Sequence, residues 1–156
     1  MNNHHQKPVF SIIIPVLNEQ ANLPNLLKDI SCQTFTNFEI IIVDGMSEDR
    51  TVANAERFRK TFPLFKIETS DKRNVCYQRN LGASKANAEW LVFMDADNRI
   101  PIYFLQGIKF QSEMLNADII STWIKPDTNS VNDKSIALLV NMFMDANQHT
   151  PQSICS

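Results

Sequence analysis

The chain has few glycines and no glycine-rich loop. Its three glycines lie far apart, so neither a GxGxxG nor a GxxxxGK[ST] pattern occurs in the 156 residues. Those two patterns bind the phosphates of dinucleotides and nucleoside triphosphates through backbone N–H groups. Their absence disfavours dinucleotide-dependent redox chemistry and P-loop hydrolysis. If the protein binds phosphate, another group must supply the positive charge, and a metal ion is the obvious candidate.

The chain also has few cysteines and histidines, and its positive and negative charges nearly balance. The odd set Cys32, Cys76 and Cys155 contains no CxxC pair, which argues against a disulfide framework or a zinc site and favours a reducing, cytosolic compartment. The three histidines show no ligand pattern. A formal net charge of -2 gives no reason to expect nucleic acid as a partner. No apolar run approaches the ~20 residues of a transmembrane segment.

Length and composition indicate one globular domain. Hydrophobic residues make up 44% of the chain and charged residues 21%, ordinary values for a protein with a buried core. Residues 1–8 lack the apolar centre of a secretory signal, and we expect them to form a disordered tail. The domain is expected to cover residues 9–156.

Short apolar runs alternate with segments of helical spacing. The runs predict strands at residues 12–17, 40–43, 64–69 and 88–94, with a fifth at 117–122. The predicted helices cover residues 23–30 (capped by Asn22), a segment from Ser47 or Asp49 through Phe62, and residues 74–86, 101–115 and 134–147, the last after a polar loop at 125–133. This alternation implies a parallel, doubly wound sheet.

Polar residues follow each of the first four runs. In chain order they are Asn18-Glu19, Asp44, Asp71-Lys72-Arg73 and the pair Asp95 and Asp97. Because the carboxyl ends of parallel strands line one edge of an open sheet, where ligands bind, we expect the four clusters to converge on one crevice.

Asp95 and Asp97 are the candidate metal ligands. Two carboxylates separated by one residue, just past a buried strand, can present oxygens to one hard cation. Bridged to a diphosphate, that cation would neutralise charge on a phosphate leaving group. The alternative is a polar turn before a helix that starts at Pro101, and the DxD pattern alone is common. Its position among the other clusters favours the metal site.

The other clusters suit a nucleotide. Asp44 could accept hydrogen bonds from a base N–H or ribose hydroxyls, or could form an Asp-Gly turn with Gly45. Glu19 could reach the same crevice, or could stabilise a helix start through the helix dipole.

Basic residues surround the start of the predicted third helix. There, Lys72, Arg73 and Arg79 would attract phosphate together with the helix N-terminal amides, although each could also belong to a solvated face. Asn80 is a poor helix former, which suggests a tertiary partner.

Four motifs together resemble the family 2 glycosyltransferases of GT-A fold. In family order over about residues 9–100 they are SIIIPVLNE at 11–19, EIIIVDGMSEDRT at 39–51, RNLG at 79–82 and WLVFMDAD at 90–97. The resemblance implies an α/β domain with a GT-A, Rossmann-like, mostly parallel sheet flanked by helices and C-terminally incomplete. Residues 9–118 would form the nucleotide-sugar-binding half, and residues 119–156 the beginning of an acceptor half.

The activity that the resemblance implies is sugar transfer from a nucleotide diphosphate donor, expected to be a UDP-sugar. Transfer would use Mg²⁺ or Mn²⁺ and invert the anomeric centre, and the acceptor would be a saccharide or a lipid-linked molecule. Many members act at the inner membrane face. The expected location is therefore cytoplasmic, with a peripheral position at that face as a further expectation.

The resemblance also implies roles for the residues that match its motifs. The segment Pro15–Glu19, with Leu17 and Asn18, would border the base, and Asp44 would hold the base or ribose. Many members have a base-stacking aromatic residue where this chain has Leu17, and Arg50 replaces a glycine in the second motif.

The remaining matched residues would handle the diphosphate. Arg73 or Lys72 would approach the base and diphosphate, and Arg79 with Asn80 matches the paired Arg-Asn of the family. Asp95 would contact the ribose or a metal-bound water, and Asp97 would ligate the metal.

No general base is identified in the chain. Inverting transfer needs a carboxylate to deprotonate the acceptor hydroxyl, and the family's base is expected C-terminal to Ser156. Asp127, Asp133 and Asp145 are expected to be solvated. The alternative function is therefore a non-catalytic nucleotide-sugar-binding module.

One other class of enzyme and one class of signalling domain share part of this pattern. Sugar nucleotidyltransferases open with a glycine-rich loop after the first strand, which Pro15–Glu19 lacks. A phosphoacceptor receiver domain needs an acidic pair there, which Asn18-Glu19 matches loosely, and it has no place for the DxD pair. Both classes rank below the glycosyltransferase.

Overall fold

A computed structural model of the chain describes residues 7–115 and 118–122. The chain divides into two compact units, residues 1–109 and residues 110–156. The sheet and the candidate site both lie in the first unit. The predicted polar loop at 125–133 and the predicted helix at 134–147 lie outside the described residues.

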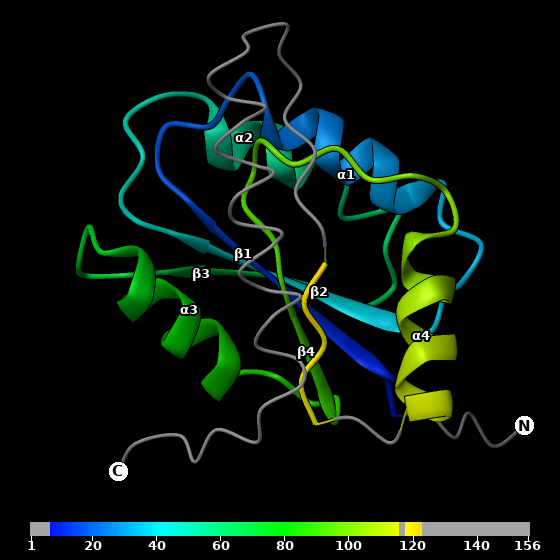
Figure 1. Ribbon diagram of the computed structural model, residues 1–156. Coiled ribbons are helices and arrows are strands. Elements are labelled where there is room, and N and C mark those ends of the chain that lie inside the picture. Colours follow the sequence, from blue (N-terminus) through cyan, green and yellow to red (C-terminus); the bar gives the residue numbers. More distant parts are fainter. Residues whose placement is uncertain (1–6, 116–117, 123–156) are drawn as a thin grey trace, which may run out of the picture. The chain divides into compact units, whose positions relative to one another are not determined.

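Four parallel strands form one sheet in the order β3-β2-β1-β4 (Figure 1). The strands are β1 (Phe10–Val16), β2 (Phe38–Asp44), β3 (Phe65–Thr69) and β4 (Trp90–Phe93). The helices are α1 (Leu23–Ser31), α2 (Thr51–Glu56), α3 (Val75–Ser84) and α4 (Phe104–Leu115). The prediction of a parallel sheet flanked by helices is confirmed.

The two central strands are the most apolar and the most deeply buried. Every residue of β1 is buried, and Ile12, Ile13 and Ile14 pair in register with Ile40, Ile41 and Ile42 of β2. β-branched side chains pack well on a pleated surface that is covered on both faces. Continuous apolar runs therefore identify these central strands.

Helix α3 packs against one face of the sheet. The chain moves outward from β1 through β2 to β3 and then crosses back to β4, so right-handed connections place α1 and α2 on one face and α3 on the other. Ile13, Ile41 and Val43 face α3, where Leu81 packs against them. A Cβ at Gly82 would lie 2.4 Å from Ile13 Cγ2. Only glycine allows α3 to approach this closely.

The predictions for α1 and α2 are confirmed in position but not in detail. Asn22 occupies the N-cap of α1, yet its side chain donates to Glu19 Oε2 (2.9 Å) rather than capping the helix. Helix α2 ends at Glu56 instead of continuing through Phe62. Beyond Glu56, the N–H groups of Phe58 and Arg59 donate to carbonyls three residues back (3.0 and 3.1 Å), so turns replace the helix.

Two predictions near the end of the described chain are wrong. The spacing of the predicted helix 101–115 predicts that Phe104, Ile108 and Leu115 face inward. Helix α4 begins at Phe104 and buries Leu105 and Ile108, whereas Leu115 is exposed. Helical periodicity predicts which side of a helix is buried, but it does not predict at which residue the packing of that side ends. Residues 118–122 of the predicted fifth strand form no strand, and residue 117 lies outside the described residues.

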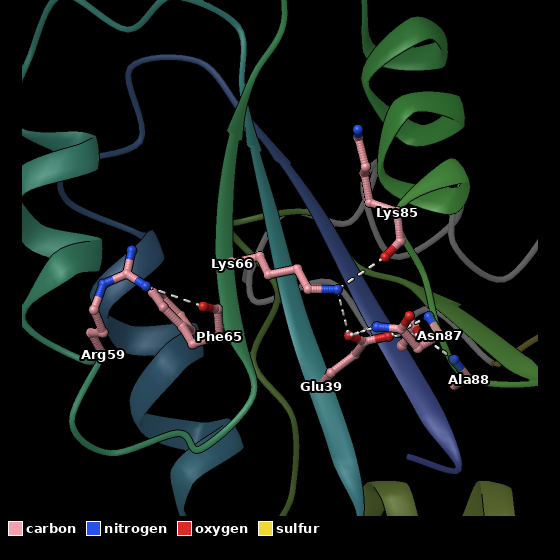
Figure 2. Close-up of polar contacts among 8 residues, drawn as sticks. Glu39, Arg59, Phe65, Lys66, Lys85, Asn87 and Ala88 are labelled. Atoms are coloured by element: carbon pink, nitrogen blue, oxygen red, sulfur yellow. Dashed lines mark hydrogen bonds and ion pairs between the residues drawn. The ribbon is translucent and has the colours of Figure 1, made fainter. Parts of the chain in front are cut away.

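A buried ionic cluster closes the amino-end edge of the sheet (Figure 2). Glu39 is 1% exposed, and its carboxylate accepts hydrogen bonds from the Ser11 hydroxyl (2.6 Å), Lys66 Nζ (3.1 Å), the Asn87 backbone N–H (2.6 Å) and Asn87 Nδ2 (2.9 Å). Burial alone would raise the pKa of Glu39, but these hydrogen bonds outweigh it and lower the pKa below its ordinary value. Glu39 therefore stays ionised inside the fold.

Candidate functional site

The strand order creates a ligand-binding position at the carboxyl-end edge of the sheet. The connection after β1 leads to β2 on one side, whereas β4 pairs with β1 on the other. Ligands of open α/β sheets bind outside the carboxyl ends of the strands at such a reversal. A pocket of about 320 Å³ lies there, within the usual range for small ligands, roughly 300–1,000 Å³. Its lining residues are Pro15, Val16, Leu17, Glu19, Arg73, Val75, Gln78, Asp95, Ala96 and Asp97.

The pocket brings together six of the residues proposed from the sequence. These are Pro15 near the end of β1, Leu17 and Glu19 after β1, Arg73 before α3, and Asp95 and Asp97 after β4. Five others lie outside its lining, namely Asn18, Asp44, Lys72, Arg79 and Asn80. The functional roles of all eleven stay predictions.

The two aspartates after β4 differ in their surroundings. Ala96 between them is buried, whereas Asp95 and Asp97 are exposed. Arg79 Nη2 contacts Asp95 Oδ1 at 2.6 Å, in an ion pair that joins α3 to the end of β4. No residue of the described part of the chain donates a hydrogen bond to the Asp97 carboxylate, which leaves both its oxygens available to a cation.

Among the described residues, Asp95 and Asp97 are the candidate cation ligands of this site. The described residues contain no group of three or more side chains arranged to hold a metal ion. Mg²⁺ characteristically keeps several waters and binds through one or two carboxylates together with substrate phosphates. The donor set of Asp97, with Asp95 beside it, fits that mode of binding.

Arg73 is the basic residue that lines the pocket, whereas Lys72 points elsewhere. Arg73 Nη2 forms an ion pair with Glu48 and donates to the Met46 carbonyl (3.2 Å), both in the loop after β2. Lys72 Nζ lies 4.5 Å from the centroid of the Tyr77 ring, a cation–π contact. Of the two residues proposed to approach a diphosphate, Arg73 is therefore the better placed.

Asn18 joins the loops that follow β1 and β2. Its backbone has φ 58°, a left-handed conformation that asparagine tolerates better than most residues. The Asn18 N–H donates to Ser47 Oγ (2.9 Å), and Asn18 Oδ1 accepts from the Glu48 N–H (2.8 Å). In this structure Asn18 therefore contacts the neighbouring loop.

Asp44 closes the turn after β2. It is 4% exposed, and its two carboxylate oxygens accept from the Ser47 N–H at 3.3 and 3.1 Å. The turn that the sequence offered as an alternative reading is therefore present. Asp44 pairs in register with Val16, so it lies beside the end of β1 although it does not line the pocket.

Gln78 is a pocket residue to which the sequence reasoning gave no function. Its spacing with Val75 and Leu81 predicts only that the three residues share one face of the third helix, and Gln78 is buried in α3. The sequence signal that could have identified it is a polar amide side chain at a helix position where burial is expected. Such a group needs hydrogen-bond partners when it is buried.

The sequence matches the family model described as "Glycosyl transferase family 2" over residues 11–151. The chain belongs to glycosyl transferase family 2. It is 37% identical over 90 residues to an uncharacterized glycosyltransferase of Haemophilus influenzae, a match that covers 58% of this chain. The match covers only 30% of the relative, so this family 2 chain spans a minor part of the relative's length.

Solved structures confirm the GT-A fold of this family 2 chain. Residues 1–349 of S. aureus TarS in complex with UDP superpose with a TM-score of 0.70 at 26% identity, covering 78% of this chain and 37% of that one. The mannosyltransferase PcManGT from Pyrobaculum calidifontis in complex with GDP-Man and Mn²⁺ gives a TM-score of 0.54 at 26% identity, covering 59% and 28%. Across the described residues, no helix combines the length and hydropathy needed to cross a membrane.

Proposed function

We propose that this domain transfers a sugar from a nucleoside diphosphate sugar to an acceptor hydroxyl, with a divalent cation and with inversion of the anomeric centre. The observation that supports this most directly is the meeting of Asp97, Asp95 and Arg73 in one pocket at the strand-order reversal of a family 2 domain. Anionic and cationic side chains placed together in this way suit a metal-bound diphosphate.

In this proposal the two ends of the pocket bind different parts of the donor. Asp97 would hold Mg²⁺ or Mn²⁺, as carboxylates commonly do for these ions. Asp95 contacts the ribose or a metal-bound water, and Arg73 contacts the diphosphate. The base lies along Pro15–Glu19, near Asp44. When bound, the cation neutralises charge that develops on the departing diphosphate.

The complexes of two relatives suggest the nucleotide and the ion. TarS has been solved with UDP and PcManGT with GDP-Man and Mn²⁺. UDP is therefore the first nucleotide to test here, and Mn²⁺ the first cation. A saccharide or a lipid-linked molecule stays the predicted acceptor.

Calorimetric titration of UDP into the 156-residue chain, with and without Mn²⁺, tests the proposal. We expect Mn²⁺ to strengthen binding, and Asp97→Asn to weaken Mn²⁺-dependent binding by about tenfold or more, because it removes an anionic ligand. Asp71→Asn is the matched control, since Asp71 is exposed and does not line the pocket. Equal UDP affinity with and without Mn²⁺, or unchanged affinity in Asp97→Asn, would refute the metal site.

A binding module without turnover is the second candidate. The carboxylates that line the pocket are Glu19, Asp95 and Asp97, and each already has a proposed role with the donor. No carboxylate of the pocket lining is thus left to deprotonate an acceptor. Chromatographic measurement of UDP release from UDP-sugars separates the candidates, because release by hydrolysis or transfer excludes the module.

A further inference from the structure

The side-chain amide of Gln78 connects helix α3 to the ends of two strands. Gln78 is 4% exposed, and its Nε2 donates to the carbonyl of Val16 (2.9 Å) and to that of Val43 (2.7 Å). Val16 is the last residue of β1, and Val43 is the second-last residue of β2. Because both acceptors are carbonyl oxygens, the NH₂ group of the amide must face them.

The Gln78 amide lies close to its neighbours, Gly45 among them. A Cβ built on Gly45 would lie 3.1 Å from Gln78 Nε2, so the absence of a side chain at Gly45 accommodates the amide. The Gly45 N–H also donates to the Val16 carbonyl (2.8 Å), which strengthens the junction between β1 and β2. Gly82, one turn further along α3, brings the helix close enough to the sheet for Gln78 to reach both carbonyls.

Few side chains can replace glutamine in this position. The amide supplies two N–H donors from one nitrogen, whereas leucine supplies none and ionised glutamate only acceptors. Without these donors, the Val16 and Val43 carbonyls lose their bonds to α3, although the Val16 carbonyl still accepts from the Gly45 N–H. The side-chain link between α3 and the ends of β1 and β2 is then lost, and either water enters or α3 shifts.

The elements that Gln78 connects also form the pocket wall. Leu17 and Glu19 follow Val16 directly and line the pocket, as does Gln78 itself. The next residue of α3, Arg79, pairs with Asp95 after β4. The position of one helical turn therefore determines how the ends of β1, β2 and β4 lie relative to one another.

We propose that Gln78 is a positioning residue for nucleotide binding. It holds the ends of β1 and β2 against α3, so that the pocket wall and the Arg79–Asp95 pair are in place before the ligand arrives. Binding to a preorganised wall avoids the free-energy cost of ordering it. This inference rests on the proposed function, since it concerns the affinity of the same pocket for a nucleoside diphosphate.

The test compares UDP affinity in the presence of Mn²⁺ for three variants of the 156-residue chain. Gln78→Leu keeps most of the side-chain volume and removes both donors, and we expect it to weaken UDP binding by about tenfold. Ser11→Ala is the matched control: it removes a buried hydroxyl from the opposite edge of the same sheet, where Ser11 donates to Glu39 and accepts from the Ala88 N–H. It should lower the urea midpoint but leave UDP affinity within about twofold of wild type.

Gln78→Glu adds a signature that loss of stability alone would not produce. At pH 8 an ionised glutamate would face two carbonyl oxygens, whereas its protonated form at pH 5 can donate one hydrogen bond to one of them. We therefore expect the ratio of its dissociation constant to that of wild type to fall from about tenfold at pH 8 to about threefold at pH 5. Taking the ratio removes the titration of UDP itself.

The outcomes distinguish this inference from the proposed function. If wild type binds UDP and Gln78→Leu binds equally well, the positioning role is wrong although the nucleotide site stands. The role is also wrong if Ser11→Ala weakens binding as much as Gln78→Leu, or if the Gln78→Glu ratio does not change with pH. Failure of wild type to bind any nucleoside diphosphate would instead overturn the proposed function and this inference with it.

Discussion

Two carboxylates at opposite edges of the same sheet, Glu39 and Asp97, have opposite surroundings. At the amino-end edge, Glu39 is 1% exposed and accepts four hydrogen bonds from three residues. At the carboxyl-end edge, Asp97 is exposed and receives no hydrogen bond from the described residues. A carboxylate whose acceptor capacity is filled by the protein contributes to stability. One whose oxygens stay available is suited to a ligand.

The path of the chain explains why the edges differ. The segment between α3 and β4 passes the amino ends of the strands, and there Asn87 donates to Glu39 while the Lys85 carbonyl accepts from Lys66 Nζ (Figure 2). The strand-to-helix loops at the other edge are linked mainly to one another, as Asn18 is to Ser47 and Glu48. Each edge thus has its own polar network, and we expect substitutions at the two edges to affect different properties.

The largest expected effect is the loss of the amino-end cluster. Glu39→Leu leaves the buried Ser11 hydroxyl and the Asn87 N–H without their acceptor and should lower the free energy of unfolding by about 3 kcal/mol. Lys66 is partly exposed and can turn to water, which limits the loss. Urea unfolding measures this effect, and UDP titration of the folded variant should show wild-type affinity.

Glu89→Gln is the control for that experiment, because Glu89 is exposed and close in sequence to the same segment. It should change the unfolding free energy by less than about 0.5 kcal/mol. If folded Glu39→Leu bound UDP more weakly than wild type, the expectation that the two edges affect different properties would be wrong.

A smaller effect is expected where α3 contacts the sheet between the two edges. In Gly82→Ala the new methyl group would lie 2.4 Å from Ile13 Cγ2, so α3 must move away from the sheet. Overpacking of this kind should cost about 2 kcal/mol. Because α3 carries Gln78 and Arg79, UDP affinity should fall as well, and urea unfolding and titration measure the two quantities on the same samples.

Gly107→Ala provides the matched control in helix α4. A Cβ there would have no heavy atom within 4 Å, and alanine should raise stability by about 0.5–1 kcal/mol through its better helix propensity. If Gly82→Ala proved as stable as wild type, the close approach of α3 would not depend on glycine.

The smallest expected effect is on the loss of stability at low pH. The pKa of Glu39 is lower in the folded protein than its ordinary value, so its stabilising contribution is complete above the unfolded-state pKa of about 4.3 and is lost as the pH falls below it. Glu39→Gln should therefore show a shallower decline of the urea midpoint between pH 6 and pH 3 than wild type. Glu89→Gln should follow wild type, and identical declines in all three proteins would show that Glu39 contributes nothing to acid sensitivity.

The strands were predictable because their signal is local. The runs around Ile12–Ile14 and Ile40–Ile42 are continuous and β-branched, and both became central strands. The end of α2 was not predictable, because the helical spacing of Val52, Ala55 and Phe58 continues past Glu56, where turns replace the helix. The predicted strand at 117–122 was wrong over residues 118–122, where an apolar run alone did not specify a partner strand.

The candidate site was only partly readable from the sequence. The DxD pair and Arg73 were identified from residue type and position after a strand, and the pocket contains all three. The loop contacts of Asn18 and the junction at Gln78 were missed, because a polar side chain in a motif does not show which neighbour it will contact. The functional roles stay predictions until binding is measured.

By itself, the sequence determined which segments become strands, that they run parallel, and that Asp95 and Asp97 follow one of them. These properties depend on residues close together in the chain. The tertiary structure alone decided that β4 pairs with β1, which brings Asp97 into the same pocket as Leu17, and that α3 lies close enough for Gln78 to reach two strands. Strand order and helix-to-sheet distance depend on packing between residues far apart in the chain, such as Gly82 against Ile13.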